Sequence, residues 1–451
     1  MGSVTYDFLA NSLLFDEDSL KNDFANESES RLEKELQSYR EHCIKNYEEL
    51  ISEIHKTKST LKVFSTTDSV PITLLKQTAL YVDQFVVPDP IFKLTDKQGS
   101  LGETTSKYLG YSEGGLDRMK IKSSAYFLKN ITPMVSGDFV KIFPLSYHFE
   151  APKQVPFYIP ENHNFNLLPK NLLDFFWNNV EVKSMIKADG GGWIIEKDLY
   201  PCRGIFIDFV ASNYSHGMLY HLLESEVLDF DDANHKITFK DTLPDTPPDV
   251  DSFNAWVAQS VNSTSKYFYD QIFIENCLAS SLECTYLTDN EFTSKLLTEN
   301  FEQPESIKTF TANQLLKVEL QFLNDIEVEK LMRIRTFDAE VFTTFRIELE
   351  KNFRELRTLN DEQIIKSKVE NIFHELNVVQ LNKINRKLST LKKQFGVNLL
   401  IGVAGLVGTM HTGGISLLAT ATALGKGYKD YKQFINDVRE NPAYFLWKIK
   451  K

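Results

Sequence analysis

Residues 394–425 read QFGVNLLIGVAGLVGTMHTGGISLLATATALG, and this stretch carries no formal charge. A single helix that crosses the hydrocarbon of a bilayer needs about 20 mostly apolar residues, and the apolar run 394–410 falls just short of that length. The adjacent Gly413 and Gly414 disfavour a continuous helix through the middle of the segment. The sequence therefore predicts two short helices folded as an αα-hairpin with a smooth face of small residues.

The large apolar side chains of this hairpin are the candidates for membrane binding. They are Phe395, Leu399, Leu400, Ile401, Val403, Leu406, Val407, Ile415, Leu417 and Leu418. The same segment also contains Ser416 and several threonines, which suit packing against protein. A hairpin buried as the core of a soluble helical bundle is therefore the competing interpretation.

Basic residues flank the hairpin on both sides. Residues 376–393 contain five basic residues and no acid, and residues 426–451 contain seven basic and three acidic residues, a net of +4, in a chain whose total charge is −12. A hairpin brings both flanks to one side, where anionic headgroups attract each Lys or Arg by ~1 kcal/mol. The predicted basic flank comprises Lys383, Arg386, Lys387, Lys392, Lys393, Lys426, Lys429 and Lys432.

Composition places the chain among globular proteins. A length of 451 residues predicts two or three domains, and 42% apolar with 25% charged residues excludes wholesale disorder and fibrous repeats. The acidic balance argues against general nucleic-acid binding. Four cysteines cannot form a disulfide framework, so we expect a reduced, cytoplasmic protein. The hairpin and its basic flanks would place this protein at the inner face of a membrane.

The pattern along the chain predicts a mainly α fold with a mixed α/β N-terminal domain and a helical C-terminal domain that ends in the small-residue αα-hairpin. A stretch with three prolines, Asp241–Asp249, is the clearest linker. The expected parts are an N-terminal segment at 1–60, a mixed α/β domain at 61–240, a linker at 241–250 and an all-helical domain at 251–451. That last domain would contain a stalk at 360–393 and the hairpin at 394–425.

Residues 28–57 read as one amphipathic helix, because apolar residues recur at four-three spacing. These residues are Leu32, Leu36, Tyr39, Cys43, Leu50 and Ile54, and Asn46 interrupts the seam. The helix would pack on its own domain or form a coiled coil between subunits. Apolar residues of the stalk follow the same spacing up to Leu376, after which the stripe shifts by one residue.

Short apolar runs within 61–240 predict the strands of the mixed domain. Phe85–Val87 ends at a Pro-Asp-Pro sequence, Phe139–Phe143 follows a helix near 116–131, and Ile205–Val210 is apolar except for Asp208. Beyond the linker, the sequence reads as helical throughout.

Asp208 is the main candidate for chemistry, because it is a carboxylate inside an apolar strand. Asp189, Glu196 and His216 lie near it in sequence, and together they could form a metal-dependent hydrolase or nuclease site. The usual acidic-x-Lys arrangement is absent, and the chain has no P-loop, His-Glu-x-x-His or Gly-x-Ser-x-Gly motif. The motifs therefore give no support for an enzyme, and we expect no cofactor and no bound metal.

Three functions remain as hypotheses. The first is a non-enzymatic interaction or effector protein whose hairpin associates with an anionic membrane under control of the N-terminal domain, as in a bacterial toxin or phage-defence effector. The second is a soluble scaffold that forms homo-oligomers or binds a protein partner and uses the hairpin as bundle core. The third is the hydrolase centred on Asp208.

Overall fold

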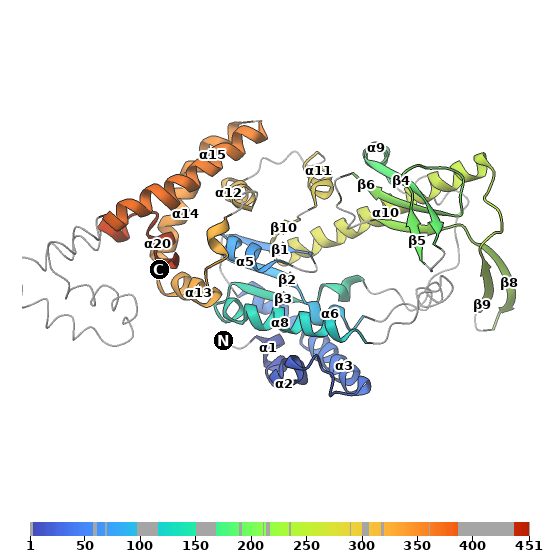
Figure 1. The fold of residues 1–451 in the computed structure, drawn as a ribbon, viewed down its shortest axis with the longest axis horizontal. Helices are drawn as coiled ribbons and strands as arrows, with labels where there is room; N and C mark the ends of the chain where they lie inside the picture. The colour runs from blue at the N-terminus through green and yellow to red at the C-terminus, as the bar shows by residue number, and fades with distance from the viewer. Residues whose placement is uncertain are drawn as a thin grey trace, which may run out of the picture.

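The computed structural model describes residues 3–56, 61–67, 70–96, 116–149, 168–188, 192–210, 212, 217–233, 236–288, 290–299, 306–316, 320–359, 361–386 and 437–450. Helices predominate around small parallel and antiparallel sheets, which confirms a mainly α chain with a mixed α/β part. The predicted αα-hairpin at 394–425 lies outside these residues. The molecule is elongated, with the last helices at one end and a two-stranded ribbon at the other (Figure 1).

A parallel sheet forms the centre of the molecule. Its strands lie in the order β10 (Thr285–Leu287), β1 (Lys62–Ser65), β2 (Gln84–Pro88) and β3 (Val140–Phe143). Every residue of β1 and β2 is buried, as expected for parallel strands with helices on both faces. The strands predicted around Phe85 and Phe139 are β2 and β3.

Strand β10 corrects the prediction that everything beyond the linker is helical. Its residues pair in parallel with β1, so that Thr285 lies opposite Val63 and Leu287 opposite Ser65. Three residues are too few to show the alternation typical of a strand. This strand is defined by a partner more than 200 positions earlier in the chain, which no local pattern reveals.

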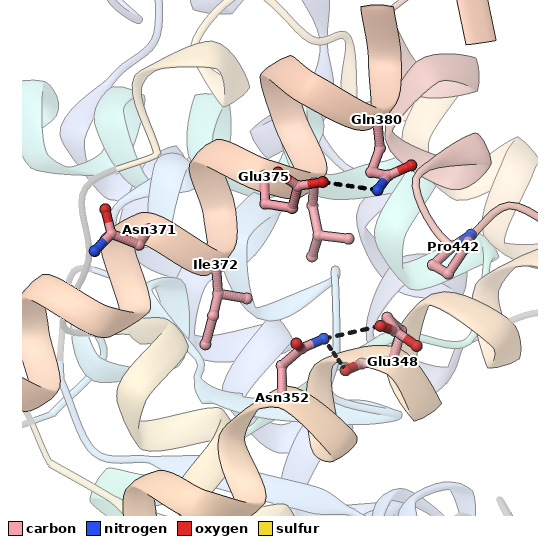
Figure 2. Close-up of a pocket in the computed structure, with 8 residues that line it drawn as sticks. Glu348, Asn352, Asn371, Ile372, Glu375, Gln380 and Pro442 are labelled. Atoms are coloured by element: carbon pink, nitrogen blue, oxygen red, sulfur yellow. Dashed lines mark hydrogen bonds between the residues drawn. The ribbon is translucent and has the colours of Figure 1, made fainter. Parts of the chain in front are cut away.

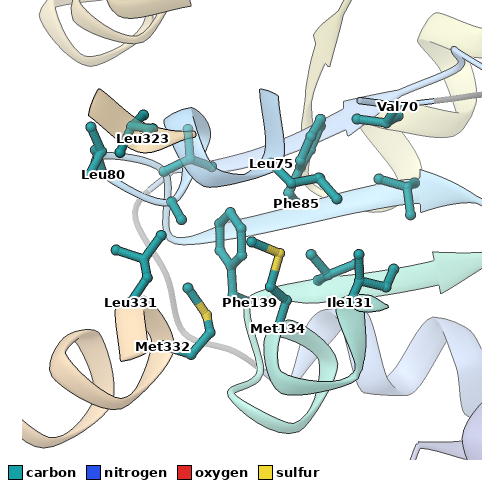
Figure 3. Packing of buried hydrophobic residues seen from close by; sticks show 14 of the residues in the cluster. Val70, Leu75, Leu80, Phe85, Ile131, Met134, Phe139, Leu323, Leu331 and Met332 are labelled. Atoms are coloured by element: carbon teal, nitrogen blue, oxygen red, sulfur yellow. The ribbon is translucent and has the colours of Figure 1, made fainter. Parts of the chain in front are cut away.

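Helices α5 (Ile72–Thr78), α6 (Pro90–Lys93) and α8 (Arg118–Ser136) cover one face of the sheet. Figure 3 shows Phe139 between Met134 of α8 and Leu331 of α13 (Val328–Phe337), with Phe85 above them. All four side chains are buried. The core of the sheet therefore includes a helix from the C-terminal part of the chain.

The predicted helix at 28–57 is two helices, α3 (Glu29–Lys45) and α4 (Tyr47–His55). The side chain of Asn46 donates to the carbonyl of His42 at 2.8 Å, and its own backbone is not helical, so the helix ends there. Seam residues on both sides of this break are buried in the core of the same chain. Short helices α1 (Val4–Leu9), η1 (Leu13–Phe15) and α2 (Glu17–Lys21) precede α3.

An antiparallel sheet lies towards the other end of the molecule. Its order is β5 (Trp193–Ile195), β4 (Val180–Lys187), β6 (Gly204–Phe209) and β7 (Met218–His221). The strand predicted at 205–210 is β6. The short helices η2 (Leu145–Phe149) and α9 (Lys170–Asn178) precede this sheet, and a separate ribbon of β8 (Glu224–Asp231) and β9 (Lys236–Thr242) follows it.

Helix α10 (Val250–Ser281) joins the two sheets. Asp249 caps it by accepting the amides of residues 251 and 252, both at 3.0 Å. Its first turns pack Phe253 on the antiparallel sheet, and its last turns pack Leu278 on the parallel sheet. The proline-rich segment 241–250 therefore leads directly into a helix that spans both sheets. The predicted division of the chain into four parts stays a prediction.

The C-terminal helices continue the central core. They are α11 (Glu291–Glu299), α12 (Ile307–Leu316), η3 (Gln321–Leu323), α13, α14 (Ala339–Phe353), η4 (Arg354–Thr358), α15 (Glu362–His374), the π-helical η5 (Glu375–Gln380) and α20 (Tyr444–Lys450). Buried residues from α12 to α20 belong to the same apolar cluster as those of β2 and α8.

Arg335 connects this helical part to the sheet. Its guanidinium donates to the carbonyls of Ala79 and Asp83, each at 2.6 Å, and to that of Val82. These carbonyls lie just before β2. The guanidinium also lies 4.5 Å from the ring centroid of Phe139, a cation–π contact. Burial lowers the pKa of Arg335 to about 9.

We expect Arg335→Ala to lower the free energy of unfolding by about 3 kcal/mol, because three carbonyls lose a charged donor in a poorly hydrated place. Arg333→Ala, which changes an exposed arginine of the same helix, should cost less than about 0.5 kcal/mol. Urea unfolding of both variants measures the difference. A loss below about 1 kcal/mol for Arg335→Ala would show that this contact is not central.

Candidate functional site

The last long helix contains a π-helical turn where the sequence pattern shifts. Buried positions recur at three or four residues up to Leu376, but the next buried position is Leu381, five residues on. In an α-helix, five residues would turn the second side chain away from the first. The π-turn η5 accommodates the extra residue, so that Leu376 and Ile384 both stay in the core. The shift in the stripe was the sequence signal of this turn.

The chain leaves the described structure after Arg386 and re-enters it at Asp437. The returning segment is firmly packed. Phe445 of α20 lies 5.3 Å from the ring of Phe342 and 5.2 Å from that of Phe345, and it is fully buried. The C-terminal aromatic residues therefore cap the helical end of the molecule.

Two hydrogen bonds join the outgoing and returning segments. The indole nitrogen of Trp447 donates to Asn385 Oδ1 at 3.0 Å, and Asn441 Nδ2 donates to Gln380 Oε1 at 3.3 Å. We call residues 375–386 together with 437–450 the stem. The stem brings the two ends of the intervening fifty residues, 387–436, to one place at one end of the molecule (Figure 1).

Buried and half-exposed acids neutralise part of the positive charge of the stem. The carboxylate of Asp338, 8% exposed, accepts Arg439 at 3.0 Å and also Lys448. Lys383 lies 3.6 Å from the carboxylate of Glu375. Of the predicted basic flank, only Lys383 and Arg386 fall within the described residues, and both are exposed. Lys387, Lys392, Lys393, Lys426, Lys429 and Lys432 lie outside them.

A cavity of about 380 Å³ lies beside the π-turn (Figure 2). Its polar groups bond to one another: Gln380 donates to Glu375 at 2.8 Å, and Asn352 donates to the carboxylate of Glu348 at 3.1 Å. The cavity is lined by Glu348, Asn352, Asn371, Ile372, Glu375, Leu376, Gln380 and Pro442. Helix α14, the π-turn and the returning segment thus meet at this cavity.

The candidate membrane-binding residues from Phe395 to Leu418 lie outside the described residues. Within the described part, no helix is both long enough and apolar enough to cross a membrane.

Asp208 has a structural environment in the antiparallel sheet. It is 7% exposed, and its carboxylate accepts the hydroxyl of Ser212. The carbonyl of Ser212 in turn accepts the side-chain amide of Asn290 at 3.0 Å. Asn290 caps α11, since its side chain accepts the amide of Thr293 at 2.9 Å. The carboxylate therefore ties β6 to the start of α11.

The hydrolase hypothesis gains no support from the described residues. The amide of Glu196 bonds to the carbonyl of Ser184 at 2.8 Å, whereas Asp208 lies opposite Glu181 on the far side of β4. Two strand spacings and three residues of offset separate them by more than about 10 Å. Asp189 and His216 lie outside the described part, and within it no three metal-ligating side chains form a group.

Sequence reasoning missed Asp89, a buried carboxylate at the end of β2. It follows β2, is 2% exposed, and accepts the amides of Ile91 and Phe92 at 2.9 Å and the hydroxyl of Tyr39 at 2.5 Å. Burial raises its pKa to about 6, although these bonds favour the charged form. The Pro-Asp-Pro sequence could have indicated this cap, since Asp before Pro commonly starts a helix.

No family model matches the chain, and no curated protein or solved structure shows significant similarity to it.

The stem bond between Trp447 and Asn385 can be tested directly. We expect Asn385→Ala to weaken the stability of the stem by about 1 kcal/mol, because the indole loses its acceptor. Asn382→Ala, which changes another exposed amide on the same helix, should have no effect. Limited proteolysis near residue 437 would measure the difference. Equal cleavage rates for the two variants would show that this bond does not hold the stem.

Asp89 predicts a specific dependence of stability on pH. Its folded pKa of about 6 exceeds the ordinary pKa of an aspartate, 3.8, so the native state binds the proton more tightly. The free energy of unfolding should therefore fall, by up to about 3 kcal/mol, as the pH rises from 4 to 6. Asp89→Asn should remove this component of the wild-type profile, as measured by urea unfolding at several pH values.

A matched control is Asp249→Asn, because Asp249 also caps a helix but is exposed. The hydroxyl of Ser252 lowers its pKa, which is the opposite direction from Asp89. The Asp249→Asn profile should keep the wild-type fall between pH 4 and 6. If Asp89→Asn keeps it as well, Asp89 is not its source.

Proposed function

We propose that the protein is a non-enzymatic effector whose uncharged segment at 394–425 associates with an anionic membrane, while the folded remainder of the chain regulates that contact. Effectors of this kind include toxins and defence proteins that act on membranes. The proposal combines the charge pattern of the sequence with the geometry of the stem.

The stem is the observation that carries the proposal. A hairpin that enters a bilayer from one side must have both ends at the same surface. The bonds from Trp447 to Asn385 and from Asn441 to Gln380 provide that arrangement, because they hold the two ends of 387–436 together. The stem also lies at one extremity of an elongated molecule, where a flat surface can reach it without colliding with the sheets (Figure 1).

The distribution of charge supports the same orientation. Asp338 and Glu375 neutralise cations within the folded stem, namely Arg439, Lys448 and Lys383. The basic residues nearest the uncharged segment are not part of the stem. They are Lys392 and Lys393 before the segment and the lysines at 426–432 after it. These residues are the ones placed in sequence to meet anionic headgroups.

The scaffold hypothesis has less support, because the apolar seam of α3 and α4 packs within its own chain. It remains an outcome of the experiment below.

Flotation of the purified protein with vesicles that contain anionic lipid tests the proposal. Wild type should float in low and in high salt, because inserted apolar surface resists screening. Val403→Asp with Leu406→Asp should abolish flotation, since each carboxylate costs about 3 kcal/mol at the bilayer centre.

A matched control separates insertion from surface attraction. Lys392→Glu with Lys393→Glu should reduce flotation, because the protein loses attraction to the anionic headgroups. A salt-resistant fraction of the protein should still float. Absence of wild-type flotation, or equal flotation of the Asp variant, would contradict the proposal. An Asp variant that is unfolded by circular dichroism would instead favour a hairpin buried as bundle core.

A further inference from the structure

The β8–β9 ribbon extends from the end of the molecule opposite the stem (Figure 1). It is a sheet of two strands, paired antiparallel from Glu224 with Thr242 to Asp231 with Lys236. An isolated two-stranded ribbon is marginally stable in water, and it normally gains stability by covering an apolar face. The ribbon therefore raises the question of what covers it.

A β-bulge makes one face of this ribbon apolar. Residues 227 and 230 are three apart and would point to opposite faces of a regular strand. The extra residue, Leu228, lies between the pair Val227–Phe239 and the pair Asp229–Thr238, and it shifts the alternation by one. Val227 and Phe230 consequently share a face, and their register partners on β9 are Phe239 and Ile237.

This apolar face is open to solvent. Val227 is 63% exposed, and Leu228 and Phe230 are each 57% exposed. Three large apolar side chains on one short exposed strand are unusual for a surface that meets only water, and they are typical of a docking site.

The charge of the ribbon restricts what can dock there. Residues 224–242 contain six acids and two lysines, a net of −4. Two of the acids, Glu226 and Asp229, are exposed on the same strand, and the alternation places them on the face opposite Val227 and Phe230. This charge repels anionic headgroups, nucleic-acid phosphates and a second copy of the same ribbon. A basic polypeptide is the complementary surface.

We propose that the β8–β9 ribbon is a docking site for a basic polypeptide segment in which Lys or Arg residues flank exposed apolar side chains. In an extended segment that lies along β8, alternate side chains reach the two faces of the ribbon, so the apolar ones contact Val227 and Phe230 while the cations lie beside Glu226 and Asp229. This interaction is independent of the membrane role of the stem, which lies at the other end of the molecule.

A labelled peptide of alternating Lys and Val, twelve residues long, provides the probe. Fluorescence anisotropy with the full chain should show binding that weakens with salt. Val227→Ser with Phe230→Ser, and separately Glu226→Lys with Asp229→Lys, should each weaken it at least tenfold. Both pairs are exposed, so the body of the protein should keep its melting temperature.

Controls match each change. Ile347→Ser removes a side chain that is 60% exposed on α14, and Glu33→Lys with Glu41→Lys reverses two exposed acids of α3. Both should bind the peptide within twofold of wild type. A peptide with Glu in place of Lys should not bind.

Absence of binding by wild type, or equal binding by the Val227→Ser, Phe230→Ser variant, would overturn the proposal. Sedimentation velocity provides the remaining outcome: a wild-type dimer that becomes monomeric in this variant would assign the face to a second copy instead. A wild-type monomer together with ribbon-dependent peptide binding supports the basic partner.

Discussion

One guanidinium group joins the two halves of the sequence. Arg335, on a helix in the C-terminal part, donates to three carbonyls that precede the second strand of the parallel sheet. The neighbouring Arg346 pairs with the carboxylate of Asp83 in the same turn and lies over the ring of Tyr81. Because α13 and α14 are fixed to the sheet in this way, α15 and α20, which pack on them, hold a fixed position as well.

The geometry of the stem depends on the attachment of α13 and α14 to the sheet. Phe445 packs between two phenylalanines of α14, and Asp338 at the start of that helix accepts two cations of the returning chain. The π-turn then adjusts the phase of the outgoing helix so that it stays on the same core. The ends of 387–436 are thus held together by contacts that do not depend on the segment between them, so a hairpin could change its surroundings while the stem stays intact.

Local patterns predicted those elements whose residues repeat within one helix or strand. The buried stripe of 28–57, the apolar strands at 85–87 and 205–210, and the phase shift after Leu376 all appear in the structure. Asn46 was visible as an interruption of the seam, but the end of the helix there was missed because the apolar spacing resumes beyond it. Strand β10 was missed because its three residues become a strand only beside β1.

The candidate sites also depend on contacts between distant residues that no local pattern reveals. Nearness in sequence suggested that Glu196 and Asp208 could act together, but the register of the sheet puts β4 between them. The environment of Asp89 depends on Tyr39, fifty residues earlier, so a sequence pattern could locate the cap but not the buried hydrogen bond. In contrast, the uncharged segment and its basic flanks are visible only in the sequence, and the structure adds how their ends are held.

Hydrogen–deuterium exchange of the intact protein, with and without vesicles of anionic lipid, measures contact between 394–425 and the membrane. Amides within 394–425 should become protected when vesicles are added, whereas those of 444–450 should keep the same exchange rate because the stem is unchanged. Exchange at 394–425 that is the same in both conditions would contradict a membrane role for this segment.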